Sequence, residues 1–194
     1  MTKGEYKRAI ATGEVQLSFR EHVEHFDVIY ILLFFDVLLG MYAAGLLFSN
    51  DQHKLGVILF FMVFSTIIGL LYWRQNSRLK LKSISTTLSK EEQRTIVERL
   101  GEEQKWLPYY LGDNAFKARA HDVYSASSGE QVTVLFGKNK IYINSMCDLH
   151  FKASWISWGR NRKHMRLLLN RITEASLQKQ ENQAPILDKI TLST

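Results

Sequence analysis

The chain has 194 residues, of which 46% are hydrophobic, and 25 lysines and arginines stand against 19 acidic residues. This length suits one or two small folded units, and the hydrophobic fraction is ordinary for a folded protein. The single cysteine excludes both an intrachain disulfide framework and a zinc site built from several cysteines. Two prolines and 11 glycines exclude a collagen-like or proline-rich disordered chain.

Residues 1–25 are mostly polar, and we interpret them as a cytoplasmic lead-in to the first apolar segment. Two histidines three residues apart on a helix could share a metal ion with a neighbouring carboxylate. A polar helix start at a membrane surface explains the same residues more simply, so we predict no metal site here. The side chains concerned are Glu21, His22, Glu24, His25 and Asp27.

Two apolar segments follow, at residues 26–48 and 55–73. As helices they would be about 34 Å and 28 Å long at roughly 1.5 Å per residue, and a bilayer core is about 30 Å thick. The polar connector at residues 49–54 is long enough only for a tight turn. We therefore predict an uncleaved transmembrane helical hairpin, because the rest of the chain has too little apolar surface to bury two such helices.

Lysine and arginine are distributed unevenly around this hairpin. The connector holds only Lys54, whereas eight basic residues flank the outer ends of the two segments: Lys3, Lys7, Arg8, Arg20, Arg74, Arg78, Lys80 and Lys82. Cytoplasmic flanks of membrane helices carry the excess of lysine and arginine. We therefore expect a multi-pass protein of the bacterial inner membrane with both termini in the cytoplasm.

Asp36 lies near the middle of the first apolar segment, where an unpaired carboxylate costs about 2.5–3.5 kcal/mol on insertion scales. Ser65 and Thr66 lie near the middle of the second segment, so the three polar side chains should share one depth. One interpretation is a proton or cation path, or the polar lining of an oligomeric pore. The other, which we favour, is a hydrogen-bonded carboxyl that pins neighbouring helices. Gly40 and Ala44 would permit close helix contact.

The remaining chain predicts a cytoplasmic α+β domain. Ser89 and Glu92 fit a capping box at the start of a helix. Strand-like patterns follow, with a hairpin turn at residues 137–139, and the last helix begins at Gly159 or Asn161. The predicted strands are residues 115–120, 131–136 and 140–146, with a fourth candidate at 151–157.

The predicted fold class is therefore an α+β membrane protein, in which a two-helix hairpin precedes a two-layer domain of a helix, three to four antiparallel strands and a helix. We place this domain at residues 89–177. Residues 74–88 are basic and are interpreted as a juxtamembrane linker, and residues 178–194 as a polar tail.

Three stretches of this domain resemble a small cytoplasmic domain of uncharacterised bacterial membrane proteins, which is sometimes appended to rhomboid-type intramembrane proteases. They are GEQVTV (129–134), KIYINSMCD (140–148) and SWGRNRKHM (157–165). In that family a Gly-Glu enters a hairpin, an Asn-Ser-x-Cys closes it, and a Gly-Arg-Asn opens the last helix. The resemblance covers roughly residues 89–172 and implies the fold but no activity. The rhomboid G-x-S-x-G motif is absent from both apolar segments, and the two-helix layout is also similar to the YcxB-like family.

A reactive thiol is the first chemistry to consider. Cys147 and His150 stand three residues apart at a strand end, a spacing that does not assemble a nucleophile, a base and an oxyanion site. We interpret Cys147 as a packed thiol.

A cluster of basic residues is the second candidate site. Residues 149–173 contain no acidic residue, and a helix N-terminus among them already carries partial positive charge. An anionic ligand such as a lipid headgroup, a nucleotide, RNA or an acidic protein would offset this charge, with Trp155 or Trp158 available for stacking. A solvated positive face is the plainer explanation. The candidate anion-binding residues are Arg160, Arg162, Lys163 and Arg166.

These features favour a non-enzymatic accessory or scaffold protein of the inner membrane, without a cofactor, which contacts lipids and associates with a protein partner or with itself through the hairpin. The alternative is a ligand-gated membrane effector. In that case the cytoplasmic domain binds an anionic signal, and the hairpins assemble into a pore around Asp36.

Reporter fusions test the predicted orientation. A reporter that is active only in the periplasm should be silent when fused to either Met1 or Thr194, because both flanks of the hairpin are basic. The same reporter inserted at Asn50 should be active. A periplasmic signal from either terminus would contradict the predicted topology.

Overall fold

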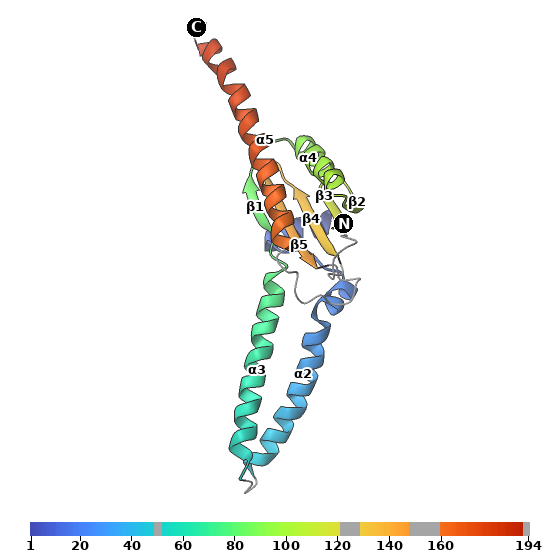
Figure 1. Ribbon diagram of the computed structural model, residues 1–194, viewed down its shortest axis with the longest axis vertical. Coiled ribbons are helices and arrows are strands. Elements are labelled where there is room, and N and C mark those ends of the chain that lie inside the picture. Colours follow the sequence, from blue (N-terminus) through green and yellow to red (C-terminus); the bar gives the residue numbers. More distant parts are fainter. Residues whose placement is uncertain (49–51, 121–128, 148–159, 192–194) are drawn as a thin grey trace. The chain divides into compact units, whose positions relative to one another are not determined.

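The computed structural model describes residues 1–48, 52–120, 129–147 and 160–191, and the chain divides into two compact units (Figure 1). The first unit joins Met1–Gln16 to Leu79–Thr194, and the second is Leu17–Arg78. The described residues form five helices and a five-stranded antiparallel sheet. The predicted α+β class is therefore confirmed.

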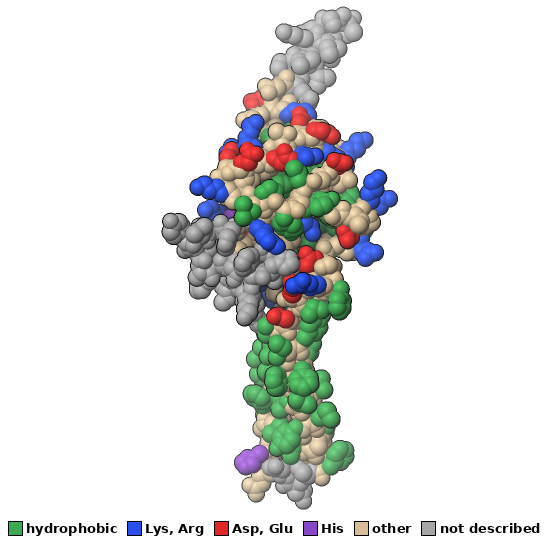
Figure 2. Space-filling model, turned by 90° about the vertical axis from the view of Figure 1, so that its right-hand side faces the viewer, with side chains coloured by type: hydrophobic (Ala, Val, Ile, Leu, Met, Phe, Trp, Pro, Cys, Tyr) green, Lys and Arg blue, Asp and Glu red, His purple; other side chains and the backbone are tan. Residues whose placement is uncertain are grey.

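The second unit consists of α2 (Phe19–Leu47) and α3 (Lys54–Ser77), which contain the two predicted apolar segments. α2 begins earlier than predicted because Ser18 and Glu21 form a capping box. Both helices are long and apolar enough to cross a membrane. In the most apolar 18-residue stretch of each helix, only 11% (α2) and 6% (α3) is buried. Hydrophobic side chains accordingly cover the surface of this hairpin in Figure 2.

The sheet of the first unit has the order β1-β5-β4-β3-β2, and every neighbouring pair is antiparallel. Its strands are β1 (Lys82–Ser85), β2 (Leu107–Leu111), β3 (Ala115–Ala120), β4 (Glu130–Phe136) and β5 (Lys140–Cys147). The structure contains the three central strands near their predicted bounds and adds the two edge strands, which were not predicted. The fourth candidate strand, residues 151–157, lies outside the described residues.

The predicted turn between β4 and β5 is present, and it requires glycine. Gly137 N–H donates a 2.9 Å hydrogen bond to the Lys140 carbonyl oxygen. A Cβ atom at position 137 would overlap that same oxygen. Any other residue here would force the hairpin open.

Two helices, α4 (Lys90–Glu103) and α5 (Arg160–Thr191), cover one face of the sheet. Side chains alternate across a strand, so every second residue of β4 points into this core. Val132, Val134 and Phe136 are all 0% exposed, as are Leu168 and Ile172 of α5. This layer is the one that the sequence predicts.

A third layer, α1 (Lys3–Thr12), packs on the opposite face and was not predicted. Ala9 packs with Ala115 and Leu135. Leu135 stands between two β4 residues of the main core, so its side chain points to the opposite face of the sheet. The Tyr6 hydroxyl donates a 2.6 Å hydrogen bond to the Phe136 carbonyl oxygen. Burial of this phenol, with Tyr142 nearby, raises the pKa of Tyr6 above its usual value. The two-layer prediction and the interpretation of residues 1–25 as a separate lead-in therefore both need correction.

A short ladder joins the two chain segments that lead into and out of the second unit. Val15 N–H donates to Leu79 O at 2.8 Å, and Leu81 N–H donates to Gly13 O at 2.7 Å. The C-terminal stretch of the first unit thus begins at Leu79 rather than at residue 89, and most of the segment interpreted as a linker is part of that unit. Leu79 is buried, while the neighbouring Lys80 is exposed.

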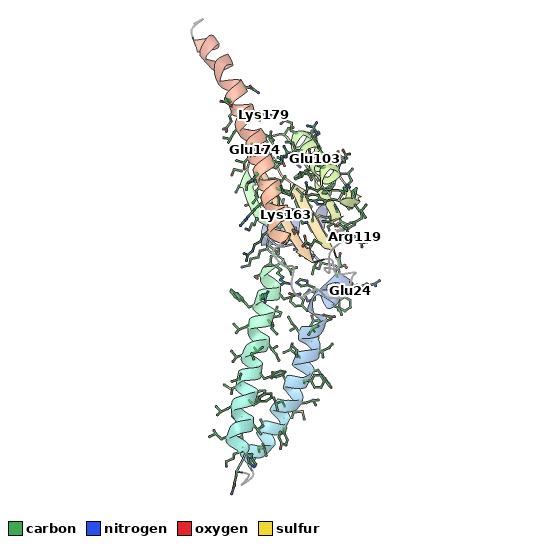
Figure 3. The ribbon with its side chains drawn as sticks, viewed as in Figure 1. Glu24, Glu103, Arg119, Lys163, Glu174 and Lys179 are labelled. Atoms are coloured by element: carbon green, nitrogen blue, oxygen red, sulfur yellow. The ribbon has the colours of Figure 1, made fainter. Side chains whose placement is uncertain are left out.

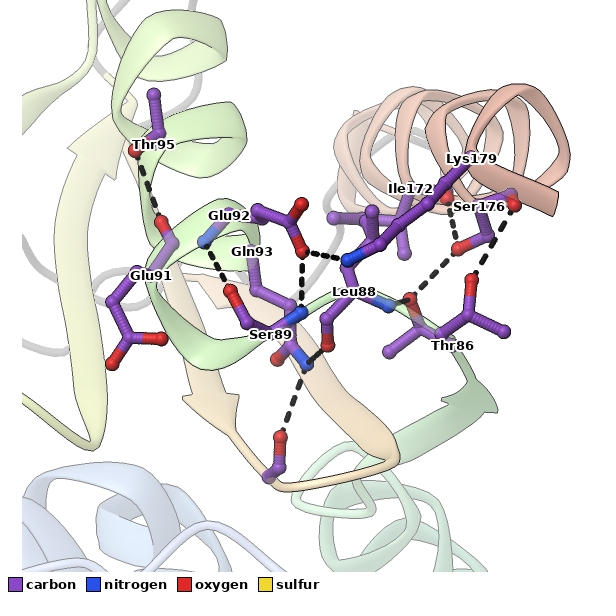
Figure 4. Close-up of polar contacts among 12 residues, drawn as sticks. Thr86, Leu88, Ser89, Glu91, Glu92, Gln93, Thr95, Ile172, Ser176 and Lys179 are labelled. Carbon is purple, nitrogen blue, oxygen red and sulfur yellow. Dashed lines mark hydrogen bonds and ion pairs between the residues drawn. The ribbon is translucent and has the colours of Figure 1, made fainter. Parts of the chain in front are cut away.

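Polar contacts hold α5 against the start of α4 (Figure 4). Lys179 Nζ lies 2.6 Å from Glu92 Oε2, and the Thr86 and Ser176 hydroxyls are 2.7 Å apart. Glu92 also accepts from Ser89 N–H, as the capping box predicts. The Lys179 ammonium and this N–H together hold the pKa of Glu92 below its usual value. The Lys179 contact lies past residue 177, and α5 continues to Thr191, where a loose polar tail was expected.

A minimal folded fragment follows from these contacts. We expect residues 1–16, joined by a short glycine–serine linker to residues 79–191, to unfold cooperatively in urea. Residues 83–177 alone should be less stable by at least about 2 kcal/mol, because they expose the α1-facing core and lose the Tyr6 hydrogen bond. Tryptophan fluorescence, to which the buried Trp106 contributes, measures both transitions. Equal stability of the two fragments would show that α1 does not belong to the fold.

Candidate functional site

Asp36 and Ser65 meet between α2 and α3. The Ser65 hydroxyl donates a 2.8 Å hydrogen bond to Asp36 Oδ1, and both side chains are half-buried. Thr66 does not join them, because its exposed hydroxyl bonds the Met62 carbonyl oxygen one turn back on α3 at 2.8 Å. The structure thus brings together two of the three polar residues singled out in the apolar segments, in the geometry of a carboxyl that links two helices.

The same carboxyl lines a groove of about 370 Å³ between the two helices, which we call the Asp36 groove. It is lined by Ile29, Leu33 and Asp36 of α2 and by Ser65, Ile68, Gly69 and Tyr72 of α3. Close helix packing occurs beside it at Gly40, where a Cβ atom would lie 3.1 Å from the Phe61 ring. Ala44, the second small residue expected at this contact, is exposed, and Ala43 is buried instead.

A second polar contact ties α2 to α3 at the end of the hairpin where the chain enters and leaves it. His25 Nε2 donates to the Gln75 carbonyl oxygen at 3.1 Å, and Gln75 Nε2 donates to the His25 carbonyl oxygen at 2.8 Å. His25 is only 5% exposed. Its imidazole therefore serves helix pairing.

Two of the other candidate metal ligands near His25, Glu21 and Glu24, are also engaged. Glu21 caps α2 by accepting from Ser18 N–H at 2.7 Å, and Glu24 lies 2.7 Å from Arg20. Over the described ranges, His, Cys, Asp and Glu side chains nowhere gather in a group of three that could hold a metal ion. The structure thus assigns these side chains to capping and pairing.

The basic cluster lies at the start of α5. Arg162, Lys163 and Arg166 are exposed, and the first turn of the helix has no acidic residue. Figure 3 labels Lys163 there, with Glu174 and Lys179 farther along the same helix. The side chain of Arg160, the fourth candidate, lies outside the described residues, as do Trp155 and Trp158. Three of the four candidate anion-binding residues therefore present positive charge to solvent.

A groove of about 230 Å³ lies farther along, between α4 and α5. Arg171 Nη2 lies 3.0 Å from Glu103 Oε2 across it, and Arg99 and Glu174 also line it. Both signs of charge are present, and one pair is already neutralised. This groove is consequently a poor match for an anionic ligand.

A buried polar cluster that the sequence analysis missed joins α5 to the sheet. Glu130 is 2% exposed, and its Oε2 lies 2.9 Å from His164 Nε2. The Trp106 ring meets the His164 ring edge-on, with centroids 5.5 Å apart. Trp106 is positioned by the end of α4, where Lys105 adopts φ 54° and Trp106 N–H donates to Gly101 O at 2.8 Å. Glu130 and His164 stand in the stretches that carry the family resemblance, but nothing in their spacing indicates that they pair.

The environment of the Cys147 thiol cannot be described. The backbone of Cys147 ends β5 opposite Glu130, while its side chain and the whole of His150 lie outside the described residues. The interpretation of Cys147 as a packed thiol stays a prediction.

Comparisons with protein-family models, with curated protein sequences and with solved structures found no match to this chain. The resemblance to a cytoplasmic domain of bacterial membrane proteins therefore stays a prediction, and the function has to be argued from the geometry above.

Substitution of His164 tests the buried cluster. His164→Ala leaves the Glu130 carboxyl buried without its partner, and we expect it to lower the free energy of unfolding by about 1–3 kcal/mol. The double variant Glu130→Leu with His164→Leu should recover much of this loss, because it removes both polar groups. Arg162→Ala, on the same helix but exposed, is the control and should change stability by less than about 0.5 kcal/mol. Thermal unfolding of the full chain in mild detergent measures all three. A His164→Ala protein as stable as the control would contradict a structural role for the pair.

Proposed function

We propose that this chain is an integral protein of the bacterial inner membrane, in which α2 and α3 span the bilayer and the α+β unit lies in the cytoplasm. One observation carries the proposal: most of the apolar surface of the hairpin is uncovered. Phe34, Phe35, Leu38 and Met41 of α2 are 61%, 56%, 48% and 69% exposed, and α3 has a similar series. Exposed apolar patches of this size in water are aggregation-prone, whereas a bilayer covers them.

The uneven distribution of lysine and arginine supports an orientation with both termini in the cytoplasm. Lysine and arginine flank the outer ends of the two helices, and the connector holds only Lys54. Exposed cations of the α+β unit, including Arg162, Lys163 and Arg166, suit a surface that faces the anionic inner leaflet. Anionic headgroups carry the charge that would offset this basic cluster.

Within the membrane we propose an accessory or scaffold role without catalysis. A gated transporter or channel has to change the spacing of its helices, and two hydrogen-bonded contacts oppose such a change in this hairpin. They are Asp36 with Ser65 and His25 with Gln75. A hairpin held in one arrangement is suited to presenting a constant surface to another membrane protein.

The ligand-gated effector is the second candidate, and the half-buried Asp36 carboxyl is the observation that favours it. In that role several hairpins would surround a pore lined by Asp36. A closed ring of copies in detergent extracts would support the effector, and a stable complex with a different membrane protein would support the accessory role.

A charge placed on the hairpin surface tests the membrane location. Val63 is 58% exposed on α3, so Val63→Lys would be harmless if the hairpin faced water. In a bilayer it should cost about 2.5–3.5 kcal/mol and shift much of the protein into the alkaline carbonate-soluble fraction. Leu111→Lys, at a site 49% exposed on β2, is the matched control and should stay in the membrane pellet. Wild-type protein extracted by carbonate would refute membrane insertion outright.

A further inference from the structure

In the Asp36 groove a carboxyl interrupts the largely apolar surface of the hairpin. Its walls are branched aliphatic side chains, Ile29 and Leu33 on α2 and Ile68 on α3. A Cβ atom added at Gly69 would meet no heavy atom within 4 Å, so the backbone of α3 is open to a close neighbour there. Gly40, in contrast, is already used by the contact with Phe61 inside the hairpin. A groove with an open glycine in its wall has room for another helix.

The Asp36 carboxyl has unused hydrogen-bonding capacity. A carboxyl group has two oxygens, which together can accept several hydrogen bonds. In the described part of the chain, the Ser65 hydroxyl is the single donor to Asp36, at 2.8 Å from Oδ1. A carboxyl at mid-bilayer depth with one neutral donor is costly to keep, and in membrane proteins ionisable groups at this depth face the interior of a helix bundle and pair with one another or with backbone groups.

Charge complementarity decides which kind of helix fits the groove. Residues 26–48 and 55–73 contain no lysine, arginine or histidine. A second copy of this chain would therefore bring only another Asp36, or the hydroxyls of Ser65 and Thr66, to this depth. Two such carboxyls face each other favourably only if they share a proton. A different chain that carries a cation satisfies Asp36 directly.

Resting on the membrane location proposed above, we infer that the Asp36 groove is the docking surface for a transmembrane helix of another protein that carries a lysine or arginine at the depth of Asp36. The cation meets the carboxyl, and the apolar flanks of the partner helix pack against Ile29, Leu33 and Ile68. The accessory role then consists of covering an intramembrane charge on the partner. Neither helix would have to leave an unpaired charge in the hydrocarbon core.

Designed transmembrane peptides test this inference without knowledge of the natural partner. Full-length protein carrying a donor dye on a C-terminal tag is reconstituted into phosphatidylcholine–phosphatidylglycerol vesicles. Three acceptor-labelled leucine-rich peptides are then titrated in. They differ only in their central residue, which is lysine, glutamine or leucine, and they are flanked by glycine and tryptophan so that no other cation is present. Energy transfer measures association.

We expect the lysine peptide to reach half-saturation at a peptide-to-lipid ratio about tenfold lower than the leucine peptide. Asp36→Asn should abolish this preference, because the amide cannot carry the counter-charge. The matched control moves the carboxyl to the next residue, Asp36→Leu with Val37→Asp, since Val37 is 60% exposed and about 100° around the helix. That variant keeps the charge and its depth but not the groove, and it should bind the three peptides equally.

Three results would overturn the inference. They are equal binding of the lysine and leucine peptides to the wild type, an unchanged preference in Asp36→Asn, or an undiminished preference in the relocated variant. Energy transfer between copies of the chain that depends on Asp36, with no lysine preference, would assign the groove to self-association instead.

Flotation of the same vesicles separates this inference from the proposed function. Protein that does not float with lipid refutes the membrane location and the inference together. Protein that floats but shows no lysine preference refutes the inference alone.

Discussion

The α+β unit is closed by a short antiparallel ladder, and the N-terminal part of the fold depends on it. Val15 and Leu81 donate hydrogen bonds across this ladder, and the chain between its two sides runs through the whole of Leu17–Arg78. Closing a flexible loop of that length would cost roughly 4 kcal/mol of chain entropy. Because α2 and α3 form a hairpin whose ends are joined by His25 and Gln75, the chain returns close to its starting point and most of this cost disappears. α1 can then pack on a sheet whose strands follow it far along the sequence.

Polar contacts also decide how the two apolar helices face each other. Since little of their apolar surface is buried in the hairpin, apolar packing alone would permit many rotations of α2 against α3. The hydrogen bond from Ser65 to Asp36 and the reciprocal bonds of His25 and Gln75 select one of them. Each contact contributes little free energy, on average about 0.6 kcal/mol between membrane helices, but wrong rotations leave a carboxyl or an amide unpaired. In this rotation, Asp36 lines the Asp36 groove and is not fully enclosed between α2 and α3.

Local signals account for the elements that could be predicted. Each of these signals lies within one continuous stretch of the chain. They are the capping box of Ser89 and Glu92, the glycine turn at Gly137 and the two long apolar segments. α1 carries the same kind of signal, a capping box of Thr2 and Glu5 and a left-handed Gly13 at its end, and could have been found. It was missed because its basic residues were interpreted as topology signals alone.

The edge strands were harder to predict for a physical reason. In β1 only Ile84 packs against the main core, while Leu81, just before the strand, packs against the α1-facing cluster, so this short segment shows no alternation that would predict a strand. In β2, Pro108 argues against a strand, and it is tolerated because the outer edge of β2 pairs with no other strand in the described sheet. Edge position is a property of the assembled sheet, so the segment itself does not reveal it.

The two apolar helices, the α+β class, the central strands and the basic charge at the start of α5 could all be predicted from the amino-acid pattern. Each of these follows from composition or from a period of a few residues. The folded arrangement was needed to show that residues 1–16 belong to the α+β unit, that Asp36 bonds Ser65 and not Thr66, and that Glu130 lies against His164. These are pairings between residues far apart in the chain, and a side chain's distant partner depends on how whole elements pack. Local pattern carries no information about that packing.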